Sequence, residues 1–358
     1  MLNQQLTYKK ILLNELDEIP VFFILSRPRT GSTLLRTLFD AHPNVQIPPE
    51  CQFIINLYPK YGECTHWTTE LIEAFVSDLS KQFLFNTWKL SSGQLREILL
   101  SLSGNISYGN MCKAVYWHYQ SLFDKKKILR IGDKNPGYAL YIHLLAQIFP
   151  EAKFIHLTRD YRDNHLSLAR VEFELPFISL TTYKWKYFYK TITDCQKTMP
   201  ERFATIRYED LVNNPHEEMK ALCDFLELPF DESVFRFYLK KEAFKKLYPE
   251  DQVNKIHASL MNPLTNSKSG LWKTQLTNRQ KAIADYTVGL VGQQAGYQRS
   301  YTKHNLTIRL LAQPGIMAGR LIYFTTHLVN RFVPYKQRQY ILSELPFVIG
   351  SSYKRIFK

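Results

Sequence analysis

The chain has 358 residues, 45% of them hydrophobic and 22% charged, which is typical of a globular protein with one large or two smaller domains. Lys and Arg exceed Asp and Glu by 46 to 32, and the net charge of +14 predicts an anionic partner such as a nucleic acid, a membrane surface or a phosphorylated small molecule. The five cysteines are widely spaced without a C-x-x-C motif. We therefore expect a reduced compartment, with neither a disulfide framework nor a metal site.

No segment has the pattern of a signal peptide or a membrane span. Near the N-terminus, polar and acidic residues at positions 14 to 18 interrupt the apolar run that a signal peptide needs. The late stretch from Leu310 to Val329 contains a proline, an arginine and a histidine, so it falls short of the roughly 20 uninterrupted apolar residues that cross a bilayer. We expect a cytoplasmic location.

The first strand–turn–helix pattern begins near residue 19. Residues 19–25 form an uninterrupted apolar run, which is typical of a strand buried on both faces. A polar turn containing Gly31 follows, and apolar residues then recur at helical spacing from Thr33 to Phe39, until His42 and Pro43 end the pattern. The segment therefore predicts a strand, a glycine turn and a helix.

The same pattern recurs further along the chain. We expect strands at 128–131, 153–157 and 204–206, with helical spacing at 140–148 and from Leu166 to Val171. Segments 68–103 and 175–200 read as helical insertions, the second rich in aromatic residues that we assign to core packing. Strands that alternate with helices predict an α/β fold whose central, mainly parallel sheet is flanked by helices.

The last 58 residues differ from the rest, and we divide the chain into an α/β domain at 1–300 and a C-terminal helical extension at 301–358. Nine Lys and Arg residues in the extension face one acidic residue, Glu344, and apolar residues lie between them. One interpretation is peripheral contact with an anionic membrane surface. The other is a helical appendage that packs on the main domain with a solvated basic face.

The turn after the first strand has the features of an anion site. Ser26 to Thr33 bring backbone N–H groups, a helix N-terminus, hydroxyls and an arginine together, and Gly31 allows close backbone approach. The pattern G-x-x-x-x-G-K-[ST] of nucleoside triphosphatases is missing. This absence disfavours a kinase or an NTPase, which is the runner-up class of enzyme.

A second anion site is expected after the strand at 153–157. Arg159 follows that strand, and Ser167 lies eight residues further on, two turns along if the segment is helical. Arginine is the natural bidentate partner of a phosphate. Two such sites at strand ends predict a ligand that is phosphorylated in two places and lies in the crevice above a parallel sheet.

These motifs resemble those of the sulfotransferases that use 3′-phosphoadenosine 5′-phosphosulfate (PAPS), especially the protein-tyrosine and bacterial branches. Pro28-Arg29-Thr30-Gly31-Ser32-Thr33 is similar to their 5′-phosphosulfate loop, and Arg159-Asp160-x6-Ser167 to their 3′-phosphate motif. Asp40-Ala41-His42-Pro43 and Arg207-Tyr208-Glu209-Asp210 are also similar. The resemblance covers roughly residues 19 to 297 and implies a P-loop-like α/β fold.

By this resemblance the nucleotide-binding residues are Arg29, Thr30, Gly31, Ser32 and Thr33 for the 5′-phosphosulfate, Arg159 and Ser167 for the 3′-phosphate, Tyr208 beside the nucleotide, and Lys268 in the late basic segment 268–273. The resemblance also implies three catalytic residues. Glu50 would be the base that deprotonates the acceptor, and Lys134, assisted by Arg29, would neutralise charge on the departing 3′,5′-ADP. His118 is the alternative base, since the cytosolic branch uses a histidine.

The predicted activity is sulfuryl transfer from PAPS to a hydroxyl. The aromatic content, the apolar helical insertions and the basic apolar extension favour a lipid-like or sterol-like alcohol as acceptor, with carbohydrates and protein tyrosines as alternatives. A non-catalytic basic protein bound to nucleic acid or membranes is disfavoured, because dispersed positive charge does not require basic and hydroxyl residues at successive strand ends. We expect no nucleic-acid partner.

Overall fold

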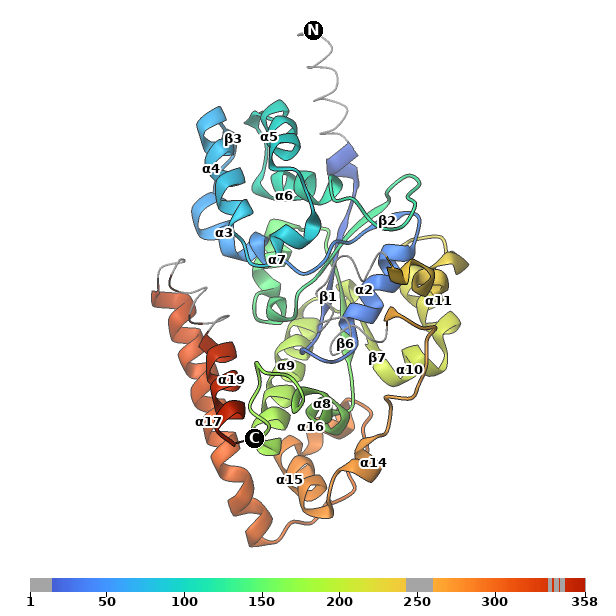
Figure 1. Cartoon of the computed structure of the whole chain (residues 1–358), viewed down its shortest axis with the longest axis vertical. Coiled ribbons are helices and arrows are strands. Elements are labelled where there is room, and N and C mark those ends of the chain that lie inside the picture. Colours follow the sequence, from blue (N-terminus) through green and yellow to red (C-terminus); the bar gives the residue numbers. More distant parts are fainter. Residues whose placement is uncertain (1–14, 243–259, 334–336, 338–340, 342–344, 358) are drawn as a thin grey trace.

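The computed structural model describes residues 15–242, 260–333, 337, 341 and 345–357. At its centre lies a five-stranded sheet in the order β2-β5-β1-β6-β7, and each neighbouring pair of strands is parallel (Figure 1). The strands of this sheet are β1 (Val21–Leu25), β2 (Val45–Gln46), β5 (Arg130–Lys134), β6 (Lys153–Thr158) and β7 (Phe203–Arg207). The predicted α/β fold with a mainly parallel sheet is therefore confirmed.

The central strand β1 is apolar throughout because its two faces contact two different cores. Phe23 and Leu25 belong to a cluster with the helical insertions, whereas Phe22 and Ile24 belong to the cluster on the opposite face of the sheet. All of β1 is buried. Alternating side chains on a strand point to opposite faces, so a strand covered on both sides loses the polar alternation that would mark a half-exposed one.

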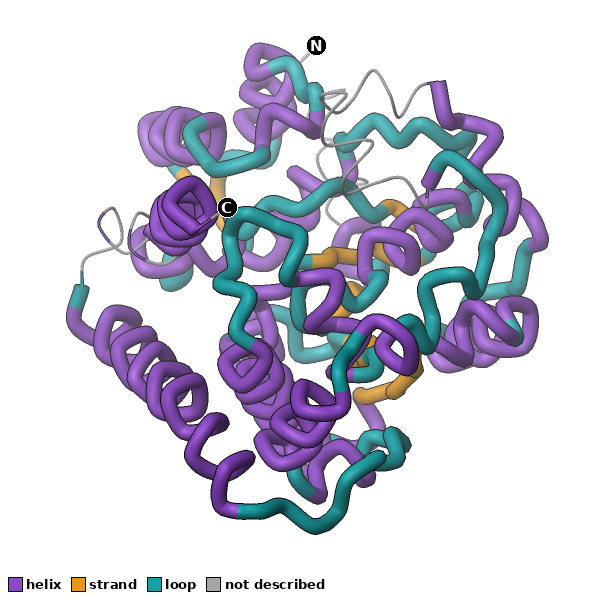
Figure 2. The backbone as a smooth tube through the Cα atoms, turned by 60° about the horizontal axis from the view of Figure 1, so that its bottom comes forward, coloured by secondary structure: helices purple, strands orange, loops and turns teal. Residues whose placement is uncertain are grey.

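Helices cover both faces of this sheet (Figure 2). On the face of Phe22 lie α2 (Ser32–Ala41), α10 (Tyr208–Asn213), α11 (Pro215–Phe225) and the 3₁₀ segment η4 (Glu232–Lys240). On the other face lie α3 (Phe53–Tyr61), α4 (Thr69–Ser80), η1 (Phe85–Trp88), α5 (Ser92–Ser101), α6 (Tyr108–Trp117), η2 (Pro136–Leu140), α7 (Ile142–Ile148) and the C-terminal part of α9 (Ile178–Thr198). A short 3₁₀ turn, η3 (Pro200–Arg202), connects α9 to β7.

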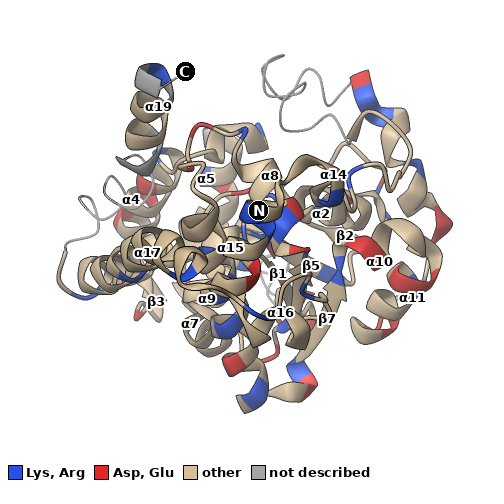
Figure 3. Ribbon diagram, turned by 90° about the horizontal axis from the view of Figure 1, so that it is seen from below, with Lys and Arg blue, Asp and Glu red and all other residues tan. Residues whose placement is uncertain are grey.

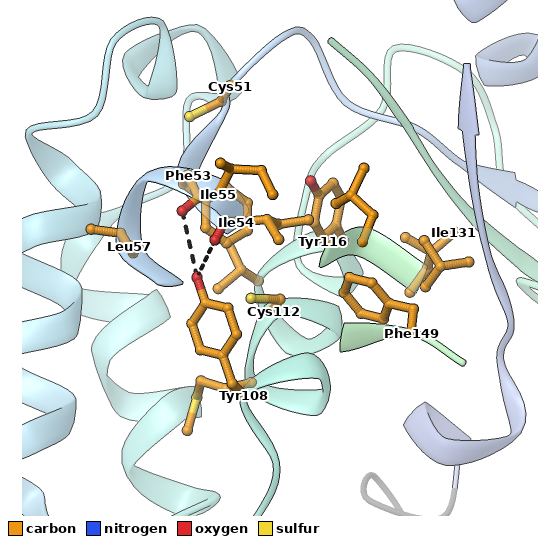
Figure 4. Packing of buried hydrophobic residues seen from close by; sticks show 14 of the residues in the cluster. Cys51, Phe53, Ile54, Ile55, Leu57, Tyr108, Cys112, Tyr116, Ile131 and Phe149 are labelled. Carbon is orange, nitrogen blue, oxygen red and sulfur yellow. Dashed lines mark hydrogen bonds between the residues drawn. The ribbon is translucent and has the colours of Figure 1, made fainter. Parts of the chain in front are cut away.

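A buried hydrogen bond joins helices α6 and α3 on this face of the sheet. The hydroxyl of Tyr108 donates to the carbonyl of Ile54 at 2.7 Å and lies 3.5 Å from that of Phe53, at the start of α3 (Figure 4). Buried aromatic and aliphatic side chains of α3 and α6 fill the space around this contact. The two-stranded sheet of β3 (His66–Trp67) and β4 (Gly104–Asn105) closes the insertion.

Two sequence expectations need correction, and three short strands were not predicted. The strand expected at 128–131 is β5, and it continues through the polar residues Asp133 and Lys134. Asp133 can be buried there because its carboxylate accepts hydrogen bonds from Tyr116 and Asn135. The helix after Arg159 is α8 (Tyr161–Leu168), which ends before Val171. The two-residue strands β2, β3 and β4 carry no periodic signal and were not predicted.

The C-terminal part of the described chain is helical, as expected for 301–358. Helices α14 (Trp272–Gln275), α15 (Asn278–Val288) and α16 (Leu290–Gln294) precede residue 301, and the described part of 301–358 contains α17 (Leu306–Phe332) and α19 (Leu345–Phe357). Helix α17 packs against α9 and α15. Within the described ranges no helix combines the length and hydropathy of a membrane span. Residues 1–14, which belong to the segment considered for a signal peptide, and residues 334–336, 338–340 and 342–344 of the extension lie outside the described ranges. The domain division at residue 300 stays a prediction.

Candidate active site

The loop after β1 has a backbone that only a few residue types adopt. Arg29 has φ +66° and Gly31 has φ +99°, both in the left-handed region. A Cβ on Gly31 would lie 2.5 Å from the ring of Tyr208, so glycine is required there both for conformation and for space. Gly31 caps α2, whose first residues Ser32 and Thr33 direct backbone N–H groups out of the helix end.

The two anion sites predicted from the sequence meet in the structure. Arg159, at the end of β6, donates from Nη1 to the carbonyl of Arg29 at 3.3 Å, and Arg29 Nε donates to Ser167 Oγ at 3.2 Å. The Arg159 guanidinium lies 4.6 Å from the ring centroid of Tyr208, and its Nη2 donates to the carbonyl of Lys268 at 2.5 Å. Thus residues from four separate segments of the chain meet around Arg29 and Arg159.

Lys134 and Glu50 also lie together, next to the same loop. Lys134 Nζ contacts Glu50 Oε1 and lies 3.3 Å from Thr33 Oγ1. The Lys134 side chain is 2% exposed, whereas that of Glu50 is 35% exposed. The ammonium group therefore faces the buried loop, and the carboxylate is accessible from outside.

The segment around Glu50 is held on both sides by neighbouring elements. Trp88 Nε1, from the helical insertion, donates to the carbonyl of Pro49 at 2.9 Å. Asn135 Nδ2, from the end of β5, lies 3.4 Å from the carbonyl of Cys51. These contacts fix the position of Glu50 relative to Lys134, although the three segments are far apart in the sequence.

His118, the alternative base, has a different environment. It caps the C-terminal end of α6, and its Nδ1 lies 2.7 Å from the carbonyl of Ala114 in the same helix. Burial lowers the pKa of His118. One ring nitrogen is thus engaged in a hydrogen bond at the helix end, and the role of His118 as the alternative base stays a prediction.

The cations of the site repel one another. Burial, followed by the charge of Arg159, lowers the pKa of Arg29, and burial followed by Arg29 and Arg159 lowers that of Lys268. Burial, followed by Arg36 and Arg29, lowers the pKa of Lys134. Arg159 Nε is buried without a hydrogen-bond partner among the described residues. These residues therefore fit a ligand that carries several negative charges and brings its own acceptors.

The late basic segment is positioned by a residue that the sequence reasoning missed. The carboxylate of Asp163, on α8, accepts hydrogen bonds from the backbone N–H groups of Gly270 at 2.6 Å and Trp272 at 2.8 Å. The guanidinium of Arg162 stacks on the Trp272 ring at 3.4 Å from its centroid. An acidic residue four positions after Arg159 was visible in the sequence, but its backbone partners more than 100 residues away were not.

Arg27 is a second residue that the sequence reasoning missed, and it holds the loop after β1 in place. Its Nη1 donates to Asn164 Oδ1 at 2.9 Å and to the carbonyl of Thr181 at 2.5 Å, and its Nη2 pairs with Glu174 at 3.0 Å. Asn164 in turn donates from Nδ2 to the carbonyl of Pro28 at 2.9 Å. The hydrogen bonds to Asn164 and Thr181 therefore hold the loop against α8 and α9. The buried ion pair with Glu174, in the segment between the two helices, would leave an uncompensated charge if one partner were removed.

Within the described ranges, no group of three or more His, Cys, Asp and Glu side chains is placed to hold a metal ion. The model of the sulfotransferase family matches residues 20–232, which is more than half of the chain. The protein belongs to the sulfotransferase family, as the loop motifs had indicated.

Curated relatives carry the name protein-tyrosine sulfotransferase. The match is 24% identical over 223 residues for the protein of Drosophila melanogaster, covering 61% of this chain and 40% of that protein. For protein-tyrosine sulfotransferase 1 of Danio rerio it is 26% identical over 226 residues, covering 61% and 56%. This chain thus spans about half the length of the curated relatives it matches.

Two solved structures share the fold. The sulfotransferase domain of the olefin synthase of Synechococcus PCC 7002 aligns with a TM-score of 0.51 at 22% identity, covering 78% of this chain and 95% of that one. The sulfotransferase domain from the curacin biosynthetic pathway aligns with a TM-score of 0.50 at 23% identity, covering 78% and 98%. At these identities the similarity establishes the fold alone.

Proposed function

We propose that this protein is a PAPS-dependent sulfotransferase that moves a sulfuryl group to a hydroxyl. The observation that carries the proposal is the meeting of the two anion sites: Arg159 Nη1 bonds to the carbonyl of Arg29, 130 residues away in the sequence. The mutual repulsion of their charges supports a ligand that is anionic at both ends. PAPS would supply the sulfuryl group and leave as 3′,5′-ADP.

The binding roles follow from position. The N–H groups and hydroxyls at the start of α2, with Arg29, would hold the 5′-phosphosulfate, since a helix N-terminus favours negative charge. Arg159 and Ser167 would hold the 3′-phosphate through guanidinium and hydroxyl donors. Tyr208 and Lys268, which both contact Arg159, would close the site around the nucleotide.

The catalytic roles follow from the different exposure of Glu50 and Lys134. Glu50, about one-third exposed, is reachable from outside and would take the proton of the acceptor hydroxyl. Lys134, almost fully buried beside Thr33, would stabilise the negative charge that develops on the leaving group. Arg29 would assist it from the loop.

For the acceptor we propose a lipid-like or sterol-like alcohol, taken from a membrane with which residues 301–358 make peripheral contact in a cytoplasmic setting. Exposed apolar residues on α17 and α19 support this choice. A protein tyrosine is the second candidate, because curated relatives bear the name protein-tyrosine sulfotransferase.

Replacing Glu50 with glutamine tests the catalytic assignment. Glutamine keeps the shape of the side chain but accepts no proton, so we expect turnover to fall by about 10² to 10⁴ while affinity for 3′,5′-ADP stays unchanged. Glu97→Gln, at an exposed position of α5, is the matched control. Turnover of Glu50→Gln equal to that of the control would refute the role of Glu50.

Two further measurements test the donor and the acceptor separately. Calorimetric titration should give binding of 3′,5′-ADP and weaker binding of ATP, whereas a preference for ATP would favour a kinase and contradict the donor proposal. Transfer of radiolabelled sulfate from PAPS is then compared across sterols, glycans and tyrosyl peptides. Transfer to a sterol supports the lipid-like acceptor, and transfer to the peptide alone overturns it.

A further inference from the structure

Large apolar side chains gather on the surface of α17 and α19. Of the fifteen large hydrophobic residues that are exposed within the described ranges, eleven lie between Leu306 and Ile349. Single exposed apolar residues are normal on any protein, but a concentration of them marks an interaction surface. The question is which face of α17 they occupy and what that face would contact.

The packing of α17 on the main domain fixes its rotation. Its buried residues, Ala312, Gly315, Ile316, Gly319 and Tyr323, follow one another at helical spacing. Neither glycine has room for a Cβ, because Gly315 lies against Ser179 and Leu180, and Gly319 against the Tyr183 ring. The Tyr323 ring stacks on that of Tyr187 with centroids 3.6 Å apart. Helix α17 therefore presents one defined face to α9.

The opposite face of α17 is a continuous apolar stripe. It consists of Leu310, Met317, Leu321, Phe324, Leu328 and Phe332, with exposed fractions between 38% and 69%. Most of these residues are three or four positions apart and, at 100° per residue, centre about half a turn from the buried face. We call these six residues the outer stripe. The alternative considered from the sequence, a helical appendage packed on the main domain with a solvated basic face, agrees with the packing of α17 on α9 and α15 but does not account for this apolar stripe.

Basic residues border the outer stripe on one side. Arg309, Arg320 and Arg331 are exposed and repeat every 11 residues, which is three turns of an α-helix, so they lie in one line along the helix. The sequence of α17 contains no Asp or Glu. The acidic side chains of α10 and α11 lie on the far side of the molecule from α17 (Figure 3). The surface around the stripe is thus both apolar and positive.

We propose that α17 lies in the interface of an anionic membrane, with the outer stripe among the acyl chains and the three arginines at the phosphate level. A helix with an apolar face and basic residues beside it has the features of an interfacial membrane helix, and arginine stems reach along apolar surface to the headgroups. The charge of residues 301–358, nine basic against one acidic, complements such a surface. This inference does not depend on sulfuryl transfer.

The same helix is connected to the candidate active site. Gly315 touches Ser179 and Leu180 at the start of α9, and the next residue, Thr181, accepts a hydrogen bond from Arg27 at the base of the anion-binding loop. Membrane attachment through α17 would therefore hold the candidate site at a fixed distance from the bilayer.

Co-sedimentation of the full chain with vesicles tests the proposal. We compare phosphatidylcholine vesicles with vesicles that also contain anionic phosphatidylglycerol, and expect clearly stronger binding to the anionic ones. Leu321→Glu with Phe324→Glu should reduce the partition coefficient by about 100-fold or more, since each apolar side chain loses its burial. The matched control is Phe83→Glu with Leu239→Glu, two residues of similar exposure outside the C-terminal helices.

The charge contribution has its own variant and outcome. Replacing the three arginines with glutamine should reduce binding to anionic vesicles by about 100-fold, and binding of the wild type should weaken as salt rises. Unchanged nucleotide affinity and melting temperature of each variant show that the fold is intact. The proposal is overturned if the wild type does not bind anionic vesicles more strongly, or if the variant with Leu321→Glu and Phe324→Glu binds as well as its control. It is also overturned if the outer stripe instead causes self-association in solution.

Discussion

Replacing Asp163 with asparagine removes the charge that holds residues 268–273 against α8. The carboxylate accepts two backbone N–H groups, from Gly270 at 2.6 Å and from Trp272 at 2.8 Å. Asparagine offers one acceptor oxygen in place of two, so one of these bonds is lost. A hydrogen bond to a charged group contributes about 1.5–3 kcal/mol, which corresponds to about 10- to 100-fold in an equilibrium constant.

We expect this loss to appear as weaker binding of 3′,5′-ADP. The segment includes Lys268, whose carbonyl accepts from Arg159, so its release also frees the arginine proposed for the 3′-phosphate. Calorimetric titration measures the affinity, and Asp194→Asn, at an exposed position of α9, is the control. An affinity within twofold of the control, with α8 still folded, would refute the view that Asp163 positions the segment.

Two further predictions concern Lys134, in the candidate active site, and His156, a buried residue of strand β6. Lys134→Ala should lower kcat by about 10² to 10³ with less effect on KM, measured by sulfate transfer, and an unchanged kcat would exclude it as the charge stabiliser. Burial lowers the pKa of His156 to about 3, so the folded state keeps it neutral while the unfolded state takes up a proton below about pH 6.5. His156 therefore lowers the free energy of unfolding as pH falls from about 6.5 towards 3. We expect the difference in this free energy between His156→Phe and the wild type to change by about 2 kcal/mol between pH 6.5 and pH 5, measured by urea unfolding. A pH-independent difference would contradict this.

The sequence predicted the fold class because the relevant signals are local. A strand buried on both faces must be apolar throughout, and residues 21–25 are. The glycine turn that follows needs a residue that tolerates positive φ, and Gly31 occupies it. The two-residue strands escaped prediction because so short a segment has no period, and their conformation is set by the neighbour they pair with.

The candidate site was only partly visible in the sequence. Arg29 and Arg159 follow strands of a parallel sheet, whose carboxyl ends meet at one edge, and Ser167 lies two helical turns after Arg159, so their proximity could be expected. Glu50 and Lys134 were singled out only through a family resemblance, and the contact between them was not predicted. Asp163 and Arg27 were missed because their partners are backbone groups and buried side chains of distant segments.

The amino-acid sequence by itself determined which residues carry charge and where most helices and long buried strands occur, and it predicted an anion site at the strand ends, because each of these inferences depends on residue type and short-range spacing. The tertiary structure alone decided which face of α17 is apolar to the outside and which side chains fasten the loop and the segment 268–273. Those properties depend on how one element is rotated against another, and that rotation is set by contacts between residues far apart in the chain, such as Gly315 on Ser179.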